Sequence, residues 1–84
     1  MDNEAWFVYV VECSDNTYYT GITNDVEKRV DAHNTKSTGA KYTKTRRPVK
    51  LLRYWTYENK SIAAKEEYKF KKLSRAKKIE LIIS

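Results

Sequence analysis

The sequence predicts an α/β protein of the α+β type, with a three-stranded antiparallel sheet flanked by about three helices. The run at residues 5–13 is almost continuously apolar, which is typical of a central strand buried on both faces. A turn at residues 14–16 separates it from a second strand-like run at 17–22, which indicates a hairpin. A third run, at 49–58, is rich in aromatic residues. With 84 residues, the chain is expected to form one domain over residues 1–84.

The predicted hairpin places two tyrosines on one face of the sheet. If its three-residue loop is symmetric, paired positions have numbers that sum to about 30, so Tyr9 faces Gly21 and Tyr19 faces Val11. Odd-numbered positions share a face, which makes Tyr9 and Tyr19 diagonal neighbours. Gly21 has no side chain and leaves space beside the Tyr9 ring. A bulge within the hairpin would shift this register by one residue.

Residues after the hairpin are expected to form the first helix. Asn24, followed three residues later by a glutamate, fits a helix cap and its partner. On a helical wheel Val26, Val30 and His33 gather on one side, and Arg29 lies at its margin. We therefore expect His33 to point toward the sheet and Arg29 to lie at the edge of the same face.

Two more helices are expected after the third strand, at residues 62–73 and from Ser74 to Ile83. The connection at residues 34–48 is polar and basic. It is long for a structureless loop in a compact domain, so we expect it to be partly helical or functional.

The composition favours an anionic partner. The chain has 17 lysines and arginines against 11 acidic residues, a formal net charge of +6, and a pI of about 9.5. A basic protein without a polyanionic partner is the alternative. The single cysteine, Cys13, lies in the first predicted strand and is expected to be buried and reduced. No apolar run is long enough to span a bilayer, so we expect a cytoplasmic protein without a membrane partner.

Short motifs in the hairpin and the following helix carry a family resemblance. The tripeptide Phe7-Val8-Tyr9 and the tripeptide Tyr19-Thr20-Gly21 stand where the GIY-YIG nuclease superfamily has its GIY and YIG motifs. The next helix carries Arg29 and His33, four residues apart. The chain also resembles the small single-domain bacterial GIY-YIG proteins of uncharacterised function through this later series: Ala63, Glu67, Lys71, Lys72, Leu73, Ser74 and Arg75.

The resemblance implies metal-dependent cutting of a nucleic-acid strand, with four catalytic residues. Tyr9 would help to activate a water, and Tyr19 would hold the phosphate or the water by its hydroxyl. Arg29 would contact the non-bridging oxygens, and His33 would exchange a proton or orient Tyr9. Taken singly, these residues have simpler explanations: core tyrosines, a hydrogen-bonded structural histidine and a solvated arginine.

GIY-YIG nucleases hold one divalent ion with a glutamate on a later helix, and two glutamates compete for that role here. Glu67 matches the series that begins at Ala63, and its helical position faces small residues that could abut the sheet. Glu66 falls on a different side. We therefore expect Glu67 to bind one Mg²⁺ (or Mn²⁺), which keeps much of its hydration. The alternative is a surface glutamate paired with Lys71 at i+4.

The basic connection also resembles that of the small proteins, at residues 39–43 and 46–48. Lys41, Arg46 and Arg47 are expected to contact phosphates, and Tyr42 could stack on an unpaired base. Solubilising charge is the alternative.

The chain departs from the family pattern at four places. Phe7 replaces the first glycine, and the interval between Tyr9 and Tyr19 is shorter by about a residue than in the homing-type members. Ile22 replaces a lysine found in repair members, and a late asparagine has no counterpart. The function expected is a Mg²⁺-dependent endonuclease acting on DNA rather than RNA, structure-specific or engaged in repair or processing. Its own specificity is expected to be poor, or else a protein partner supplies it. The alternative is a nucleic-acid-binding or adaptor module with little or no catalysis.

Overall fold

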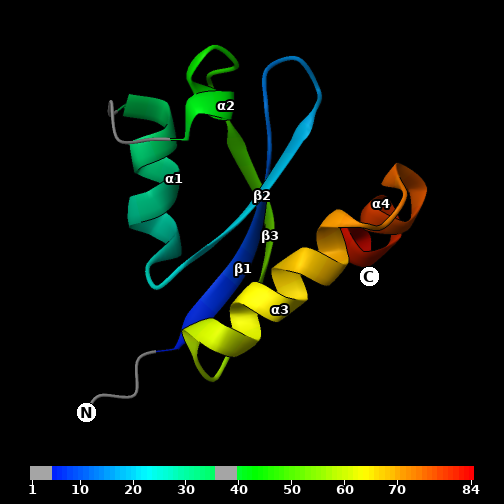
Figure 1. The fold of residues 1–84 in the computed structure, drawn as a ribbon. Helices are drawn as coiled ribbons and strands as arrows, with labels where there is room; N and C mark the ends of the chain where they lie inside the picture. Colours follow the sequence, from blue (N-terminus) through cyan, green and yellow to red (C-terminus); the bar gives the residue numbers. More distant parts are fainter. Residues whose placement is uncertain (1–4, 36–39) are drawn as a thin grey trace.

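A three-stranded antiparallel sheet with helices on both faces forms the protein, as the computed structural model of residues 5–35 and 40–84 shows (Figure 1). Gly39 and the rest of 36–39 lie outside the described residues, as do residues 1–4. The predicted fold class is confirmed. The helix beyond the three expected ones is the short α2, inside the basic connection that was predicted to be partly helical. The elements are β1 (Trp6–Glu12), β2 (Tyr18–Thr23), α1 (Val26–Thr35), α2 (Lys41–Lys44), β3 (Lys50–Tyr57), α3 (Lys60–Lys71) and α4 (Arg75–Ile83).

The first strand is the centre of the sheet, in the order β2-β1-β3. In the hairpin, Tyr9 pairs with Gly21 and Val11 pairs with Tyr19, so the predicted register is confirmed. The pairing of β1 shifts on its other side, where Val10 faces Arg53 but Val11 faces Leu51. Because the hairpin itself is regular, both tyrosines stay on one face.

The hairpin turn is held by its own polar side chains. Asn16 has a φ of 67°, in the left-handed region that asparagine tolerates better than most residues. The carboxylate of Asp15 accepts hydrogen bonds from the backbone N of Thr17 at 3.2 Å and from its hydroxyl at 2.6 Å. These contacts fix the turn length, and with it the register of the two strands.

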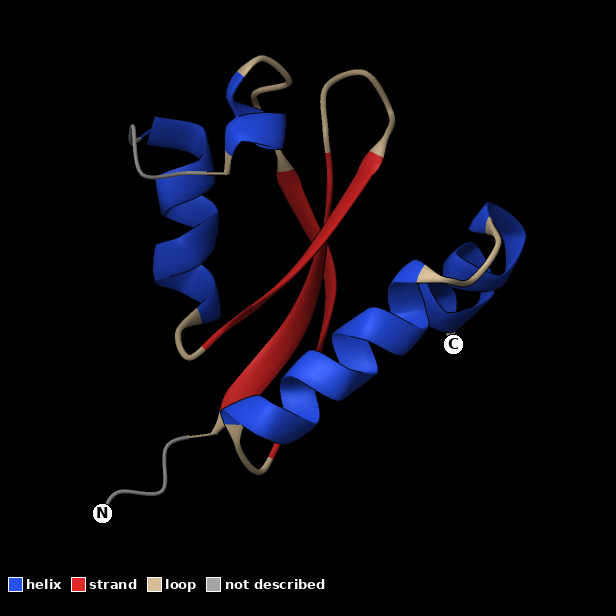
Figure 2. Cartoon of the chain, viewed as in Figure 1, coloured by secondary structure: helices blue, strands red, loops and turns tan. Residues whose placement is uncertain are grey.

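Each face of the sheet packs against a different helix (Figure 2). On the face of Tyr9 and Val11, the core includes Cys13 and side chains of α1, among them Val26 and Val30. On the opposite face α3 covers β1, and its buried Phe70 contacts the ring of Trp55 at 5.4 Å between centroids. Residue alternation along β1 therefore sends the tyrosine toward α1 and the valines at even positions toward α3.

The first helix starts one residue later than the sequence suggested. Asp25, not Asn24, caps it: its carboxylate accepts from the backbone N of Lys28 at 3.1 Å. The hydroxyl of Thr23 accepts from the backbone N of Asp25 at 3.1 Å, which turns the chain between the end of β2 and the start of the helix. The later helices are capped by Asn59 and Ser74.

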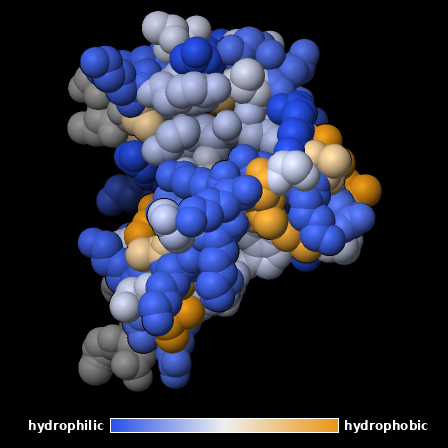
Figure 3. Space-filling model, turned by 45° about the vertical axis from the view of Figure 1, so that its right-hand side comes forward, coloured by the Kyte–Doolittle hydropathy of each residue, from blue (hydrophilic) through white to orange (hydrophobic). Residues whose placement is uncertain are grey.

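The last helix is attached to the sheet through β3. Arg53 donates to the carbonyl of Ile82 at 3.2 Å and to that of Ser84. A hollow of about 290 Å³ lies between α4, α3 and the sheet, lined by Val8, Trp55 and Phe70 among others. On this side the surface is mostly hydrophilic, with small hydrophobic patches (Figure 3). None of the helices in the described ranges is long and apolar enough to cross a membrane.

Replacing Gly21 with alanine is predicted to damage the fold at Tyr9. An added Cβ would lie 2.7 Å from the Tyr9 hydroxyl and 2.9 Å from the ring carbon that bears it, and a rigid ring cannot yield locally. We expect Gly21→Ala to lower the free energy of unfolding by roughly 1–3 kcal/mol in urea titrations. The double variant with Tyr9→Ala should cost less than the sum of the two single changes. Additive costs would show that Gly21 does not serve the tyrosine.

Candidate active site

Two residues far apart in the sequence form a hydrogen bond inside the protein. The hydroxyl of Tyr9, on β1, lies 2.7 Å from Nε2 of His33, on α1. Tyr9 is 1% exposed and His33 is 0% exposed, so both groups are fully removed from water. His33 points toward the sheet, as its helical position predicted. A buried pair of this kind is held strongly because neither group has water as an alternative partner.

The hydrogen bond continues into α2. Nδ1 of His33 lies 2.8 Å from the hydroxyl of Thr43, which is also 0% exposed and lies 2.9 Å from the carbonyl oxygen of Ala40. The guanidinium of Arg47 donates to the backbone carbonyl of His33. Segment 40–47 therefore contacts the histidine at both its ring and its backbone.

An aromatic cluster surrounds this chain of hydrogen bonds. The ring of Tyr19 lies 6.5 Å from that of Tyr9 and 5.3 Å from that of His33, measured between centroids. Tyr19 also stacks on Tyr42 of α2, at 5.9 Å and 23°. The structure thus brings the two predicted catalytic tyrosines and the predicted histidine together, and adds Tyr42 to them.

Arg29 acts on the same hydroxyl from the margin of α1. Burial raises the pKa of Tyr9 to about 12, although a hydrogen bond from Arg29 and its positive charge work in the opposite direction. Burial, with the charges of Arg29 and Arg47, lowers the pKa of His33 to about 4. Both groups are therefore neutral at pH 7, and a neutral imidazole accepts a hydrogen bond at one nitrogen and donates one from the other.

Of the two competing glutamates, Glu67 is the one whose charge acts on Tyr9. Its negative charge raises the pKa of Tyr9, whereas the charge of Glu66 acts on Tyr57 instead. The side chain of Glu67 is 21% exposed, against 36% for Glu66. Glu66 lines the hollow on the far side of the sheet. The two glutamates therefore lie in different surroundings, as their positions on the helical wheel predicted.

Glu67 could supply one carboxylate ligand to a hydrated ion such as Mg²⁺. Over the described parts of the chain, no three histidine, cysteine or acidic side chains come together as a metal cluster. Glu67 pairs with Lys71 at 3.1 Å, which is the alternative that its sequence position also allowed. One carboxylate suits Mg²⁺, an ion that keeps several waters and takes further ligands from a phosphate. An ion would have to replace Lys71 at this carboxylate.

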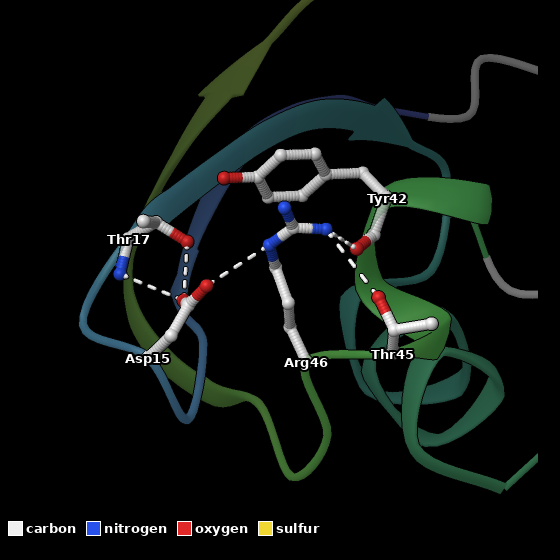
Figure 4. Close-up of polar contacts among 5 residues, drawn as sticks. All are labelled: Asp15, Thr17, Tyr42, Thr45 and Arg46. Atoms are coloured by element: carbon white, nitrogen blue, oxygen red, sulfur yellow. Dashed lines mark hydrogen bonds and ion pairs between the residues drawn. The ribbon is translucent and has the colours of Figure 1, made fainter.

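The predicted nucleic-acid-binding residues lie beside this site, but three of them, Tyr42, Arg46 and Arg47, also make contacts within the protein. Arg46 pairs with Asp15 of the hairpin turn at 3.0 Å and lies over the ring of Tyr42 at 4.0 Å (Figure 4). It also donates to the carbonyl of Tyr42 at 2.9 Å. Arg47 is held at the His33 backbone, as described above, and Lys41 is exposed. Tyr42 as a whole residue is 38% exposed.

Sequence reasoning missed two residues that shape the site. Thr43 was treated as part of a basic loop, although a threonine between polar neighbours gives no sign that its hydroxyl will be buried. Asn34, next to His33, exchanges hydrogen bonds with the backbone of Val49, at 3.1 Å and 2.7 Å. The available signal was its spacing: Asn34 follows Val30 by four residues, so it lies on the inward side of the helix.

Comparison with known proteins assigns the chain to a family. The family described as GIY-YIG catalytic domain matches residues 5–80. The chain belongs to the GIY-YIG family. The resemblance drawn from the motifs is therefore confirmed.

Relatives of this GIY-YIG domain are named UPF0213 proteins. The chain is 52% identical over 79 residues to the UPF0213 protein of Staphylococcus aureus (strain Mu3), covering 94% of this chain and 95% of the relative. It is 47% identical over 81 residues to UPF0213 protein DP2720 of Desulfotalea psychrophila, covering 96% of this chain and 74% of the relative.

Two solution NMR structures share the fold. UPF0213 protein BH0048 of Bacillus halodurans has 42% sequence identity and a TM-score of 0.59, covering 93% of this chain and 82% of that one. Protein EF2693 of E. faecalis has 38% identity and a TM-score of 0.61, covering 96% of this chain and 88% of that one.

The buried histidine of this GIY-YIG domain predicts a loss of stability in mild acid. Unfolded His33 binds a proton below about pH 6.5, but folded His33 does so only below about pH 4. In that window the unfolded state binds more protons, so the free energy of unfolding rises with pH and levels off above about 6.5. The contribution is at most about 3 kcal/mol.

Urea titrations from pH 4 to pH 7 measure this contribution against His33→Gln, which does not titrate. The wild type should gain more stability across the window than the variant, whatever their absolute stabilities. Parallel curves for the two proteins would mean that His33 is protonated in the folded state as readily as in the unfolded one.

Proposed function

We propose that this GIY-YIG protein is a divalent-metal-dependent endonuclease that hydrolyses phosphodiester bonds in DNA. The proposal rests on the buried Tyr9–His33 hydrogen bond, with Arg29 and Glu67 acting electrostatically on the same hydroxyl. A phenol, a cation and a carboxylate around one point supply what phosphodiester hydrolysis needs: an activated water, neutralised phosphorane oxygens and a metal ligand. The net charge of +6 supports a polyanionic substrate.

In the proposed reaction, water attacks phosphorus, the P–O bond to the leaving strand breaks, and the departing oxygen takes up a proton from a solvent water. The Tyr9 oxygen takes the proton of the water as its own proton moves toward His33 Nε2. Arg29 meets the negative charge that builds on the non-bridging oxygens, and Tyr19 holds the phosphate or the water. The pKa values of about 12 for Tyr9 and about 4 for His33 mean that His33 only orients the tyrosine before substrate binds.

Glu67 would hold one Mg²⁺ (or Mn²⁺) through its carboxylate. Such an ion supplies positive charge that lowers the pKa of a bound water and polarises the phosphate. Because this charge would lie near Tyr9, it would also offset the effect of burial on the pKa of that residue.

A second candidate function is a nucleic-acid-binding or adaptor module with little or no catalysis. The observation that favours it is the burial of Tyr9, whose side chain is only 1% exposed. A general base must reach the water that it activates, so catalysis requires the substrate or an ion to open the site at this hydroxyl. Nicking by purified protein separates the two functions.

We also propose a substrate class, a partner and a cellular location for this protein. DNA is proposed over RNA, with structure-specific cutting in repair or processing, and a protein partner is proposed to supply specificity. A cytoplasmic location is proposed because Cys13 is a free, buried thiol, which suits a reducing compartment.

Changing Tyr9 to phenylalanine tests catalysis. Tyr9→Phe keeps the ring and its packing but removes the hydroxyl, so we expect DNA affinity to stay near the wild-type value while Mg²⁺-dependent nicking falls roughly 10²-fold or more. Cleavage is measured with both proteins purified in parallel, on plasmid, flapped DNA and RNA. The control is Tyr68→Phe, because Tyr68 is 63% exposed on α3.

Nicking by Tyr9→Phe at the wild-type rate would remove Tyr9 from the mechanism. Equal absence of nicking in wild type and variant, with DNA binding retained, would establish the adaptor function instead.

Exchanging the glutamates tests the ion. Glu67→Gln should abolish Mg²⁺-dependent nicking because the amide lacks the charge that holds the ion, whereas Glu66→Gln should be mild. Amide chemical shifts followed during titration with Mg²⁺ locate binding without any substrate. Shifts that gather around Glu66 and spare Glu67 would contradict the assignment.

Removing charge beside α2 tests whether this segment binds nucleic acid. The double variant Lys41→Gln, Arg46→Gln should weaken duplex binding and flatten the log–log dependence on salt by about 0.9 for each phosphate that the protein no longer neutralises. The control is Lys60→Gln with Lys65→Gln, which removes the same charge from exposed positions on α3. Equal salt dependence in the two double variants would show that Lys41 and Arg46 contribute only general surface charge. Tyr42→Ala should weaken binding of flapped DNA by about 1–3 kcal/mol if it stacks on a base.

A further inference from the structure

Thr43 is the end of a buried chain of hydrogen bonds that begins at the proposed catalytic tyrosine. Three short contacts lie in series: Tyr9 hydroxyl to His33 Nε2 at 2.7 Å, His33 Nδ1 to Thr43 hydroxyl at 2.8 Å, and Thr43 hydroxyl to Ala40 carbonyl at 2.9 Å. Tyr9, His33 and Thr43 are each at most 1% exposed. The direction of each donation is therefore decided inside the protein and not by solvent.

The carbonyl oxygen of Ala40, the last acceptor in the series, determines the direction of every hydrogen bond in the chain. A carbonyl oxygen can only accept, so the bond to Ala40 uses the single proton of the Thr43 hydroxyl. The Thr43 oxygen then accepts from His33 Nδ1–H, which leaves Nε2 without a proton. Nε2 in turn accepts the proton of Tyr9, and the Tyr9 oxygen keeps its lone pairs for other partners.

The opposite tautomer of His33, with the proton on Nε2, gives fewer of these groups a hydrogen-bond partner. With the proton on Nε2, the Thr43 hydroxyl would donate to Nδ1 and lose its bond to Ala40. Nδ1 would gain a contact of 3.4 Å from the Ala40 backbone N, near the limit of a hydrogen bond. The Tyr9 oxygen would then receive both Nε2–H and the hydrogen bond from Arg29, and its own proton would lose its acceptor.

We propose that Thr43 is a positioning residue that fixes His33 as the Nδ1–H tautomer, so that Nε2 accepts from Tyr9. The tautomer determines which way the tyrosine proton points, because a phenol has only one. With that proton on the histidine side, a lone pair of the Tyr9 oxygen is available to accept a hydrogen bond from a water. The role of Thr43 in catalysis rests on the proposed function, but the tautomer itself does not.

The same geometry gives segment 40–47 a second task besides contact with nucleic acid. Thr43 lies one residue after Tyr42, which stacks on Tyr19, and four residues before Arg47, which binds the His33 backbone. Movement of α2 on binding a strand would therefore act directly on the histidine ring.

The experiment uses the whole chain with histidine labelled in the ring by ¹⁵N. Long-range ¹H–¹⁵N correlation spectra separate protonated from unprotonated ring nitrogens, and His33 is the only histidine. In the wild type we expect Nδ1 protonated and Nε2 unprotonated at pH 7. In Thr43→Val, which keeps the shape but removes the acceptor, we expect the proton to shift wholly or partly to Nε2.

Two further variants complete the design. Thr43→Ser retains the hydroxyl and should keep the wild-type tautomer. Thr45→Val removes a hydroxyl from an exposed neighbour and should change nothing. Where the wild type nicks DNA, Thr43→Val should be about tenfold slower or worse at unchanged DNA affinity, and Thr43→Ser should restore the rate.

A wild-type spectrum with the proton on Nε2 would overturn the proposal, and it needs no variant to fold. An unchanged tautomer in Thr43→Val would overturn it as well. Absence of nicking in every protein would count against the proposed function alone, since the ring spectra would still report whether Thr43 sets the tautomer.

Discussion

The hydrogen bond between Tyr9 and His33 is the interaction on which the rest of the structure depends. It joins the central strand to the first helix where no water can replace either partner. Three neighbouring residues make this hydrogen bond possible. Gly21 gives the tyrosine ring room on the adjacent strand, and Thr43 satisfies the far side of the imidazole. Arg47 fixes the helix backbone at the histidine. The fold and the candidate site are therefore stabilised by the same atoms.

The electrostatic setting of this bond is suited to an anion. Positive charge from Arg29 and Arg47 helps to lower the pKa of His33, so the imidazole resists protonation while the site lacks negative charge. A phosphate placed among these cations would offset their effect and raise the pKa of His33 again. The same negative charge would also raise the pKa of Tyr9, as the charge of Glu67 does, so an anion would make His33 easier to protonate without making Tyr9 a stronger acid. The resting protein avoids a charged pair in its core.

Patterns of period two and of helical period were sufficient to predict the sheet, its hairpin register and the inward direction of His33. These features follow from short-range rules: Asp15 and Asn16 make a compact turn, and side chains alternate along a regular strand. The helix cap was predicted one residue too early because Asn24 and Asp25 are both good capping residues, and in the structure Asp25 is the one that accepts from the backbone N of Lys28. The choice between Glu66 and Glu67 came from helix phase and family resemblance.

The position of segment 40–47 was out of reach for such reasoning. Its basic residues suggested a surface arm, and the exposure of Lys41 agrees with that. Burial of the Thr43 hydroxyl depends on how the chain returns from α1 to β3, over a connection whose path no periodicity specifies. Tertiary contacts of this kind, between a polar side chain and an equally polar partner, leave no trace in hydrophobic spacing.

The attachment of α4 to β3 has a practical side. Arg53 binds carbonyl oxygens at Ile82 and Ser84, so the final turn of the helix holds a cover over the aromatic wall formed by Trp55 and Phe70. Trimming those few residues would leave the guanidinium without these acceptors and uncover the rings, and the shortened protein would tend to self-associate during purification. An affinity tag joined at this end should therefore follow a flexible spacer that lets the helix finish its last turn.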